Sequence, residues 1–339
     1  MIWVIIIFFW LSILLYFLLG GADFGAGIIE LFTSRRRIKR TRTTLYHAIG
    51  PVWEANHMWL IIAIVILFVG FPTIYSVLSV HLHIPLTLML LGIIARGTAF
   101  VFRHYDAVRD SMQDLYNRVF VWSSFVTPFF LGIIAGATLS GRIDPRADSF
   151  QNGFLFPWLN FFSIAVGIFT IALCGFLAGV YLVGEAENEA DRSSFIRKAR
   201  NANILAVVIG GFVFLAARID DVPLVSWVIT DPVGLTAVIA ASISVVALWL
   251  TIRTGNRWVT RGLVVFQVTM ILLAISHEHF PDLVLLRSGE NLSLLKDHAP
   301  ARTVEALAWA LLTGSILILP ALFYLYYSFQ KKPARAQGV

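Results

Sequence analysis

Nine long apolar runs constrain the fold of this sequence more than any other feature. They cover residues 3–32, 49–71, 78–102, 118–139, 157–184, 201–217, 232–252, 259–276 and 303–327. Each is near or above the roughly 17 residues that a helix needs to cross a bilayer. Because hydrocarbon offers the backbone no hydrogen-bonding partner, each run has to satisfy its own backbone groups as a helix. We therefore expect an all-α polytopic membrane protein with nine transmembrane helices.

Composition supports the same class. Hydrophobic residues make up 58% of the chain and charged residues 14%, whereas soluble domains have about 45–50% and about 25%. The net charge of +6 does not predict a nucleic-acid partner, because the basic residues lie between the apolar runs. The single cysteine, Cys174, excludes an internal disulfide and a CxxC pair.

The distribution of basic residues predicts the orientation. The odd-numbered connections and the C-terminal tail contain 19 of the 26 Lys and Arg residues, and the even-numbered connections contain six. Since cytoplasmic connections are enriched in Lys and Arg, we expect the N-terminus outside and the C-terminus in the cytoplasm. Residues 1–19 lack the basic start of a signal peptide, so we expect the first helix to be retained.

A faint internal repeat suggests how the helices are grouped. The first helix contains Gly21-xxx-Gly25 and the fifth contains Gly175-xxx-Gly179, a spacing that lets helix backbones approach closely. We expect one membrane domain over 1–339. Within it, 1–139 would form a four-helix bundle, 157–276 a second, 303–327 a peripheral ninth helix and 328–339 a cytoplasmic tail.

Ionisable residues inside the runs are the candidate functional residues. Asp23 lies among glycines in the first run, Glu54 and His57 lie within one turn of the second, and Arg96 lies in the third. A charge at mid-bilayer costs about 2.5–3.5 kcal/mol, so such residues usually face protein or water. Asp23, Glu54 and Arg96 belong to the middle or cytoplasmic part of the membrane, where they predict a polar track open to the cytoplasm.

Two interpretations of this track remain open. Glu54 and His57 are three residues apart and share a helix face, so they are candidates for a proton relay with Asp23. Alternatively, Arg96 neutralises a carboxylate in a purely structural cluster. A lone membrane histidine beside a carboxylate favours hydrogen bonding over haem ligation, and we predict no metal site and no catalytic residue in this chain.

The motifs around these residues resemble subunit II of the cytochrome bd-type quinol oxidases. The resemblance rests on the glycine-rich stretch around Asp23, on Gly50-Pro51-x-Trp53-Glu54-x-Asn56-x-x-Trp59 and on Arg96-Gly97-x-Ala99-Phe100-x-Phe102-Arg103. Their order and spacing match over nearly the whole chain. Gly21, Gly25, Trp53, Asn56, Trp59 and Arg103 are the motif residues to which we assign structural roles.

The resemblance implies a heterodimer in the bacterial cytoplasmic membrane. In that family, subunit I carries two b-type haems, one d-type haem and the quinol site, and the complex oxidises quinol and reduces dioxygen to water with cytoplasmic protons. Subunit II is usually haem-free, supports assembly and contributes acidic residues to a proton path. A bound quinone or lipid and small single-helix subunits are further expectations.

Two positions depart from the family pattern. Gly20 stands where the family often has aspartate, and Glu54-Ala55 stands where it commonly has Asp-Gly. Glutamate keeps a titratable carboxylate with a longer reach, so we expect Glu54 to take the role of the family's aspartate. Because Gly20 has no carboxylate, Asp23 is the main candidate on the first helix for a carboxylate in the proton path.

Two other functions compete with an oxidase subunit. In a proton-coupled transporter, the same buried charges would bind substrate, although transporters often contain inverted repeats and the faint repeat here is parallel. In a purely structural membrane subunit, the charges would only hold helices together and contact a partner.

Overall fold

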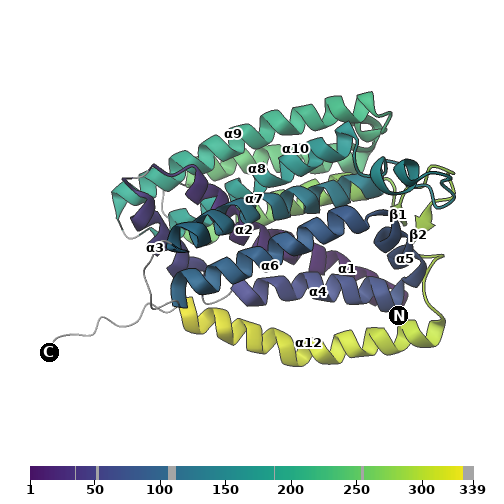
Figure 1. Ribbon diagram of the computed structural model, residues 1–339, viewed down its shortest axis with the longest axis horizontal. Coiled ribbons are helices and arrows are strands. Elements are labelled where there is room, and N and C mark those ends of the chain that lie inside the picture. Colours follow the sequence, from purple (N-terminus) through teal and green to yellow (C-terminus); the bar gives the residue numbers. More distant parts are fainter. Residues whose placement is uncertain (35, 51–52, 106–111, 187, 253–255, 331–339) are drawn as a thin grey trace.

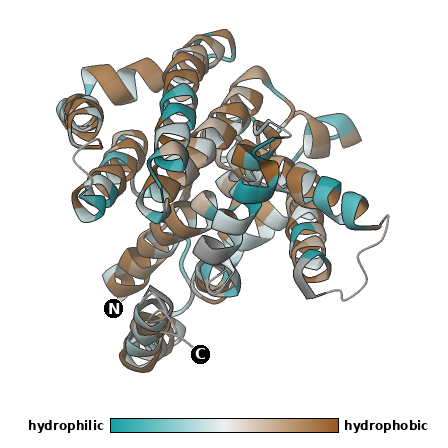
Figure 2. Ribbon diagram, turned by 90° about the vertical axis from the view of Figure 1, so that its left-hand side faces the viewer, coloured by the Kyte–Doolittle hydropathy of each residue, from teal (hydrophilic) through white to brown (hydrophobic). Residues whose placement is uncertain are grey.

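Helices make up almost the whole of the described chain. A computed structural model describes residues 1–34, 36–50, 53–105, 112–186, 188–252 and 256–330. Within these ranges nine helices are long and apolar enough to cross a membrane, which confirms the all-α polytopic prediction. Figure 1 shows the long helices running side by side along the length of the molecule. In Figure 2 they are coloured mostly brown, with hydrophilic residues gathered in a few turns.

The first span is built from three consecutive elements. These are α1 (Ile2–Leu15), a π-helical turn η1 (Tyr16–Gly20) and α2 (Gly21–Leu31). π-helical turns inside α-helices are frequent at functional sites, and this one ends three residues before Asp23. A short helix, α3 (Ile38–Ile49), follows, and then α4 (Trp53–Gly70) forms the second span.

The next spans are α6 (His83–Tyr105), α7 (Met112–Leu139), α8 (Phe161–Glu185) and α9 (Glu189–Ile219). They are followed by α10 (Pro232–Thr251), α11 (Arg257–Ser276) and α12 (Ala301–Gln330). An asparagine or aspartate caps each of four successive helices. Asn160, Asn188, Asp231 and Asn256 accept hydrogen bonds from first-turn backbone N–H groups of α8, α9, α10 and α11. Such caps satisfy donors that a helix start leaves unpaired, so they fix where these spans begin.

Several short elements gather at one end of the bundle. They are α5 (Pro72–His81), the π-helical turns η2 (Gln151–Leu155) and η3 (Ser226–Thr230), and a hairpin of β1 (Asp282–Val284) and β2 (Leu292–Ser293). Figure 1 shows β1, β2, α5 and the N-terminus at this end, and α3 at the opposite one. We call them the hairpin end and the α3 end. By the predicted orientation, the α3 end faces the cytoplasm.

Burial ranks the spans from centre to edge. In the most apolar stretch of α8, 72% of residues are buried, against 11% in α12. Helix α8 packs against α2, α7 and α9. Helix α12 lies along the edge of the molecule beside α4 (Figure 1) and exposes large apolar residues such as Ile316, Leu317 and Phe323. The third predicted run, 78–102, begins too early, because α5 ends at His81 and α6 starts at His83.

Candidate functional site

A buried ion pair joins the first and third spans. Arg96 Nη1 donates to Asp23 Oδ2 at 2.6 Å, and Arg96 Nη2 donates to Asp23 Oδ1 at 2.7 Å. Nη2 also donates to the Asp23 backbone carbonyl at 2.9 Å. Both side chains are 1% exposed. This two-point pairing is among the strongest that a guanidinium forms with a carboxylate, and it neutralises both charges away from water.

Helix α7 supplies the walls of this pair. Ser124 Oγ accepts a hydrogen bond from Arg96 Nε at 3.0 Å, so each of the three guanidinium nitrogens donates at least one hydrogen bond. The guanidinium carbon lies 4.9 Å from the centre of the Phe120 ring and 5.3 Å from that of Phe24. Gly27 lets α2 come close, because a Cβ there would meet Ser124. The pair is therefore enclosed by fitted neighbours on α2 and α7.

A second ion-pair cluster lies further along α2 and α6, closer to the α3 end. The Glu30 carboxylate, 1% exposed, accepts from Arg103 Nη2 at 2.9 Å and from Arg42 Nε at 2.6 Å. Arg103 also lies over Phe120, 4.9 Å from its centre, so both arginines of α6 contact this one ring. Residues that line a pocket beside the cluster are Glu30, Arg42, Leu45, Tyr46, Phe100, Arg103 and Phe120.

The two pairs repeat with one spacing. Glu30 follows Asp23 by seven residues, and Arg103 follows Arg96 by seven. Seven residues are two helical turns, so each set lies on one face, about 10 Å apart along the axis. The sequence motifs predict Arg103 only as a structural residue and do not single out Glu30. The matched seven-residue spacing was the signal that could have found both.

His57 turns toward Asp23. Its Nε2 lies 3.9 Å from Asp23 Oδ2, and its ring contacts the rings of Tyr16, Phe24 and Trp53. Its Nδ1 is buried and has no hydrogen-bond partner among the described residues. The same holds for Tyr16 Oη and Trp59 Nε1. Since most buried polar groups have a hydrogen-bond partner, these three unpartnered atoms are exceptions.

Glu54 lies apart from this cluster. It occupies the first turn of α4 and is exposed on the surface of the chain. No described residue gives it a hydrogen bond or ion pair, so the Glu54–His57 contact suggested by their spacing is not seen. Asp23, His57 and Arg96 are brought together, whereas Glu54 faces outward.

The remaining motif residues pack around these groups. The Trp53 ring lies 5.3 Å from that of Phe100 and covers Gly97, where a Cβ would lie 3.1 Å from the indole. Asn56 and Trp59 are buried on α4. Gly21 and Gly25 face α8, and a Cβ on Gly25 would meet the Cys174 carbonyl and Ala178. The glycines allow α2 and α8 to pack at close range.

The surroundings of His57 do not fit a haem. Three aromatic rings lie within 6.5 Å of the imidazole, centre to centre, and Asp23 lies 3.9 Å from Nε2. An axial ligand instead needs open space in front of a ring nitrogen for a flat macrocycle. The hydrogen-bonding role that we expect for His57 stays a prediction, because Nε2 lies 3.9 Å from Asp23 and Nδ1 has no partner among the described residues.

Comparisons with known proteins agree with the motif resemblance. Cytochrome bd ubiquinol oxidase subunit 2 of Bacillus subtilis (strain 168) is 25% identical over 328 residues, which cover 94% of this chain and 92% of that protein. Cytochrome bd-I ubiquinol oxidase subunit 2 of Escherichia coli (strain K12) is 25% identical over 165 residues, or 48% of this chain and 43% of that one.

A solved structure has the same fold. A chain of the bd oxidase from Geobacillus thermodenitrificans superposes with a TM-score of 0.77 at 18% identity, covering 97% of this chain and 99% of that one. The sequence profile of the family described as "Cytochrome bd terminal oxidase subunit II" matches residues 1–329. Because that match spans almost the entire sequence, the chain belongs to the cytochrome bd terminal oxidase subunit II family.

Proposed function

We propose that this chain is the haem-free subunit II of a complex that oxidises quinol and reduces dioxygen to water, taking up cytoplasmic protons. Family membership already makes it a membrane-bound subunit of a terminal oxidase, with a subunit I as partner and haem in the complex. The finer assignments are proposals: two b-type haems, one d-type haem and the quinol site in subunit I, and an inner-membrane location with the N-terminus outside.

We further propose a division of labour among the buried charges. Protonation of Asp23 would leave the guanidinium of Arg96 buried without its counterion, and breaking a buried pair costs about 3–5 kcal/mol. A carboxylate held at both oxygens is therefore a poor proton carrier. The observation favours a structural role for Asp23, Arg96, Glu30 and Arg103, as fixed pairs that lock α2 to α6.

Glu54 is the better candidate for proton transfer. It is a carboxylate on a membrane helix, exposed on this chain and unpaired among the described residues. A charge that faces lipid is costly. We therefore expect subunit I or water, and not lipid, to contact Glu54 in the complex. His57, one turn further along α4, would connect Glu54 to the buried polar atoms around Asp23.

Purification of the complex from native membranes tests the oxidase assignment. The chain should copurify with one larger membrane subunit, the optical spectrum should contain b-type and d-type haem bands, and the preparation should consume oxygen with added quinol. A preparation of the chain that contains no haem protein would exclude this function. Solute uptake by the isolated chain in vesicles would favour the transporter alternative.

A further inference from the structure

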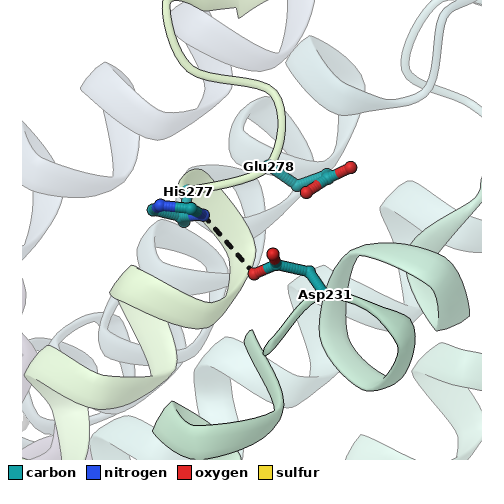
Figure 3. A group of neighbouring side chains, drawn as sticks. All are labelled: Asp231, His277 and Glu278. Carbon is teal, nitrogen blue, oxygen red and sulfur yellow. Dashed lines mark ion pairs between the residues drawn. The ribbon is translucent and has the colours of Figure 1, made fainter. Parts of the chain in front are cut away.

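Three potential metal ligands meet at the hairpin end, away from the buried charges of α2 and α6. Asp231 is the residue before α10, and His277 and Glu278 directly follow α11. One ligand atom from each lies within 4.8 Å of those of the other two. Figure 3 shows His277 and Asp231 pointing toward one another, with Glu278 beside them. We propose that these residues bind a divalent transition-metal cation such as Zn²⁺.

The distance between the first two ligands suits a metal. His277 Nδ1 lies 3.4 Å from Asp231 Oδ2. Zinc bonds of about 2.0–2.2 Å in a tetrahedral arrangement place two ligand atoms about 3.3–3.5 Å apart. Glu278 is exposed, so its side chain is free to rotate the remaining distance. One imidazole and two carboxylates, completed by water, form a three-ligand set of the kind found in open zinc sites.

Asp231 is held in place independently of any metal. Its Oδ2 accepts a hydrogen bond from the Gly234 backbone N–H at 2.6 Å, which caps α10. The carboxylate is 13% exposed, and its other oxygen has no hydrogen bond that ties it elsewhere among the described residues. Capping and the contact with His277 both use Oδ2, and neither explains why the Glu278 carboxylate lies beside them.

Local electrostatics also favour a cation. Asp231 and Glu278 bring two negative charges to one place, and Glu278 lies just beyond the C-terminus of α11, where backbone carbonyls add partial negative charge. A bound cation would neutralise both carboxylates and interact favourably with the helix end. It would also join the start of α10 to the end of α11.

The chemistry of the set indicates the class of ion. Imidazole suits Zn²⁺, Cu²⁺, Ni²⁺ and iron, whereas Ca²⁺ and Mg²⁺ prefer sites made of oxygen alone. The sequence predicted no metal site, because Asp231 lies in a different connection from His277 and Glu278 and only the fold brings them together.

Zinc binding to the assembled, metal-depleted complex tests the site. Titration with Zn²⁺, read by calorimetry and by elemental analysis after dialysis, should give one more bound ion in the parent than in His277→Ala. Asp231→Asn keeps a capping side chain and should weaken this ion's binding at least tenfold, as should Glu278→Gln. His83→Ala is the matched control, because His83 is an exposed histidine at the same end and should leave zinc binding unchanged.

Two results would overturn the proposal. One is equal zinc binding by the parent and His277→Ala, with haem spectra showing that both complexes are intact. The other is a parent whose site prefers Ca²⁺ and keeps that ion in His277→Ala, since the imidazole would then have no part in it. X-ray absorption at the zinc edge should contain one imidazole nitrogen, and its absence would likewise contradict the assignment.

Discussion

Asp23 and Arg96 form a two-point ion pair in which each side chain is 1% exposed. The pair lies 73 positions apart in the chain, and so does the second pair, Glu30 and Arg103. Equal separations mean that α2 and α6 run in the same direction with matched register. Two carboxylates on one helix thus meet two guanidiniums on the other, and both guanidiniums lie 4.9 Å from the centre of the Phe120 ring.

Removing one charge of the first pair should destabilise the protein strongly. Asp23→Asn leaves Arg96 buried without a counterion, at a cost of about 3–5 kcal/mol. We expect a lower thermal denaturation midpoint and a reduced yield of assembled complex. Asp148→Asn, at an exposed position, is the control. If both variants denature at the same temperature, the buried pair does not hold the helices together.

The second pair should behave as a coupled unit. Glu30→Gln and Arg103→Gln each leave a partner unpaired, whereas the double variant removes both charges together. We expect the double variant to lose less stability than the two single losses added, by about 0.5–3 kcal/mol. Thermal denaturation of all four proteins measures this. Strict additivity would mean that Glu30 depends on Arg42 alone.

Adding one methyl group at Gly25 tests the close packing of α2 against α8. Gly25→Ala places a Cβ against the Cys174 backbone, so α2 has to move away from α8. Overpacking of this kind costs about 1–3 kcal/mol, and assembly should fall. Gly211→Ala is the matched control, because no atom lies within 4 Å of its new Cβ. Equal yields and denaturation midpoints for the two variants would argue against close packing at Gly25.

His279 gives the hairpin end a dependence on pH. Burial lowers the pKa of this imidazole, whose Nδ1 lies 2.8 Å from the Asp282 carbonyl oxygen. The unfolded chain, with a histidine pKa of about 6.5, therefore binds more protons than the folded one. Stability should be full above that value and should fall as pH drops below it.

Thermal denaturation between pH 5 and pH 8 (about the range in which histidine titrates) measures this effect. His279→Gln should flatten the acid side of the curve, whereas His83→Gln, at an exposed position, should leave it unchanged. A parent that is equally stable on both sides of the histidine range would contradict the prediction.

The spans could be predicted from sequence because they depend on run length alone. All nine runs correspond to spans among the described residues, since each buries its backbone without help from the others. The short elements could not be predicted in this way. Helices α3 and α5 and the hairpin are too short or too polar to stand out, and they depend on contacts with other parts of the chain.

The site was predicted only in part for the same reason. Asp23, His57 and Arg96 were identified as charges in apolar runs, but that Arg96 pairs with Asp23, and not with Glu54, depends on the packing of three helices. Glu30 was overlooked near the end of its run, although it is as buried as Asp23. The division into two four-helix bundles stays a prediction.

Proton uptake by Glu54 variants tests the central proposal most directly. The assembled complex, reduced and mixed with oxygen in weakly buffered solution with a pH dye, reports proton uptake and haem oxidation together. The complex that carries Glu54→Gln should contain its normal haem, but its proton uptake and oxygen turnover should be at least tenfold slower. The complex that carries Glu54→Asp should recover most of both rates. Full proton uptake and turnover in Glu54→Gln would remove this residue from the proton path and leave the subunit a structural role.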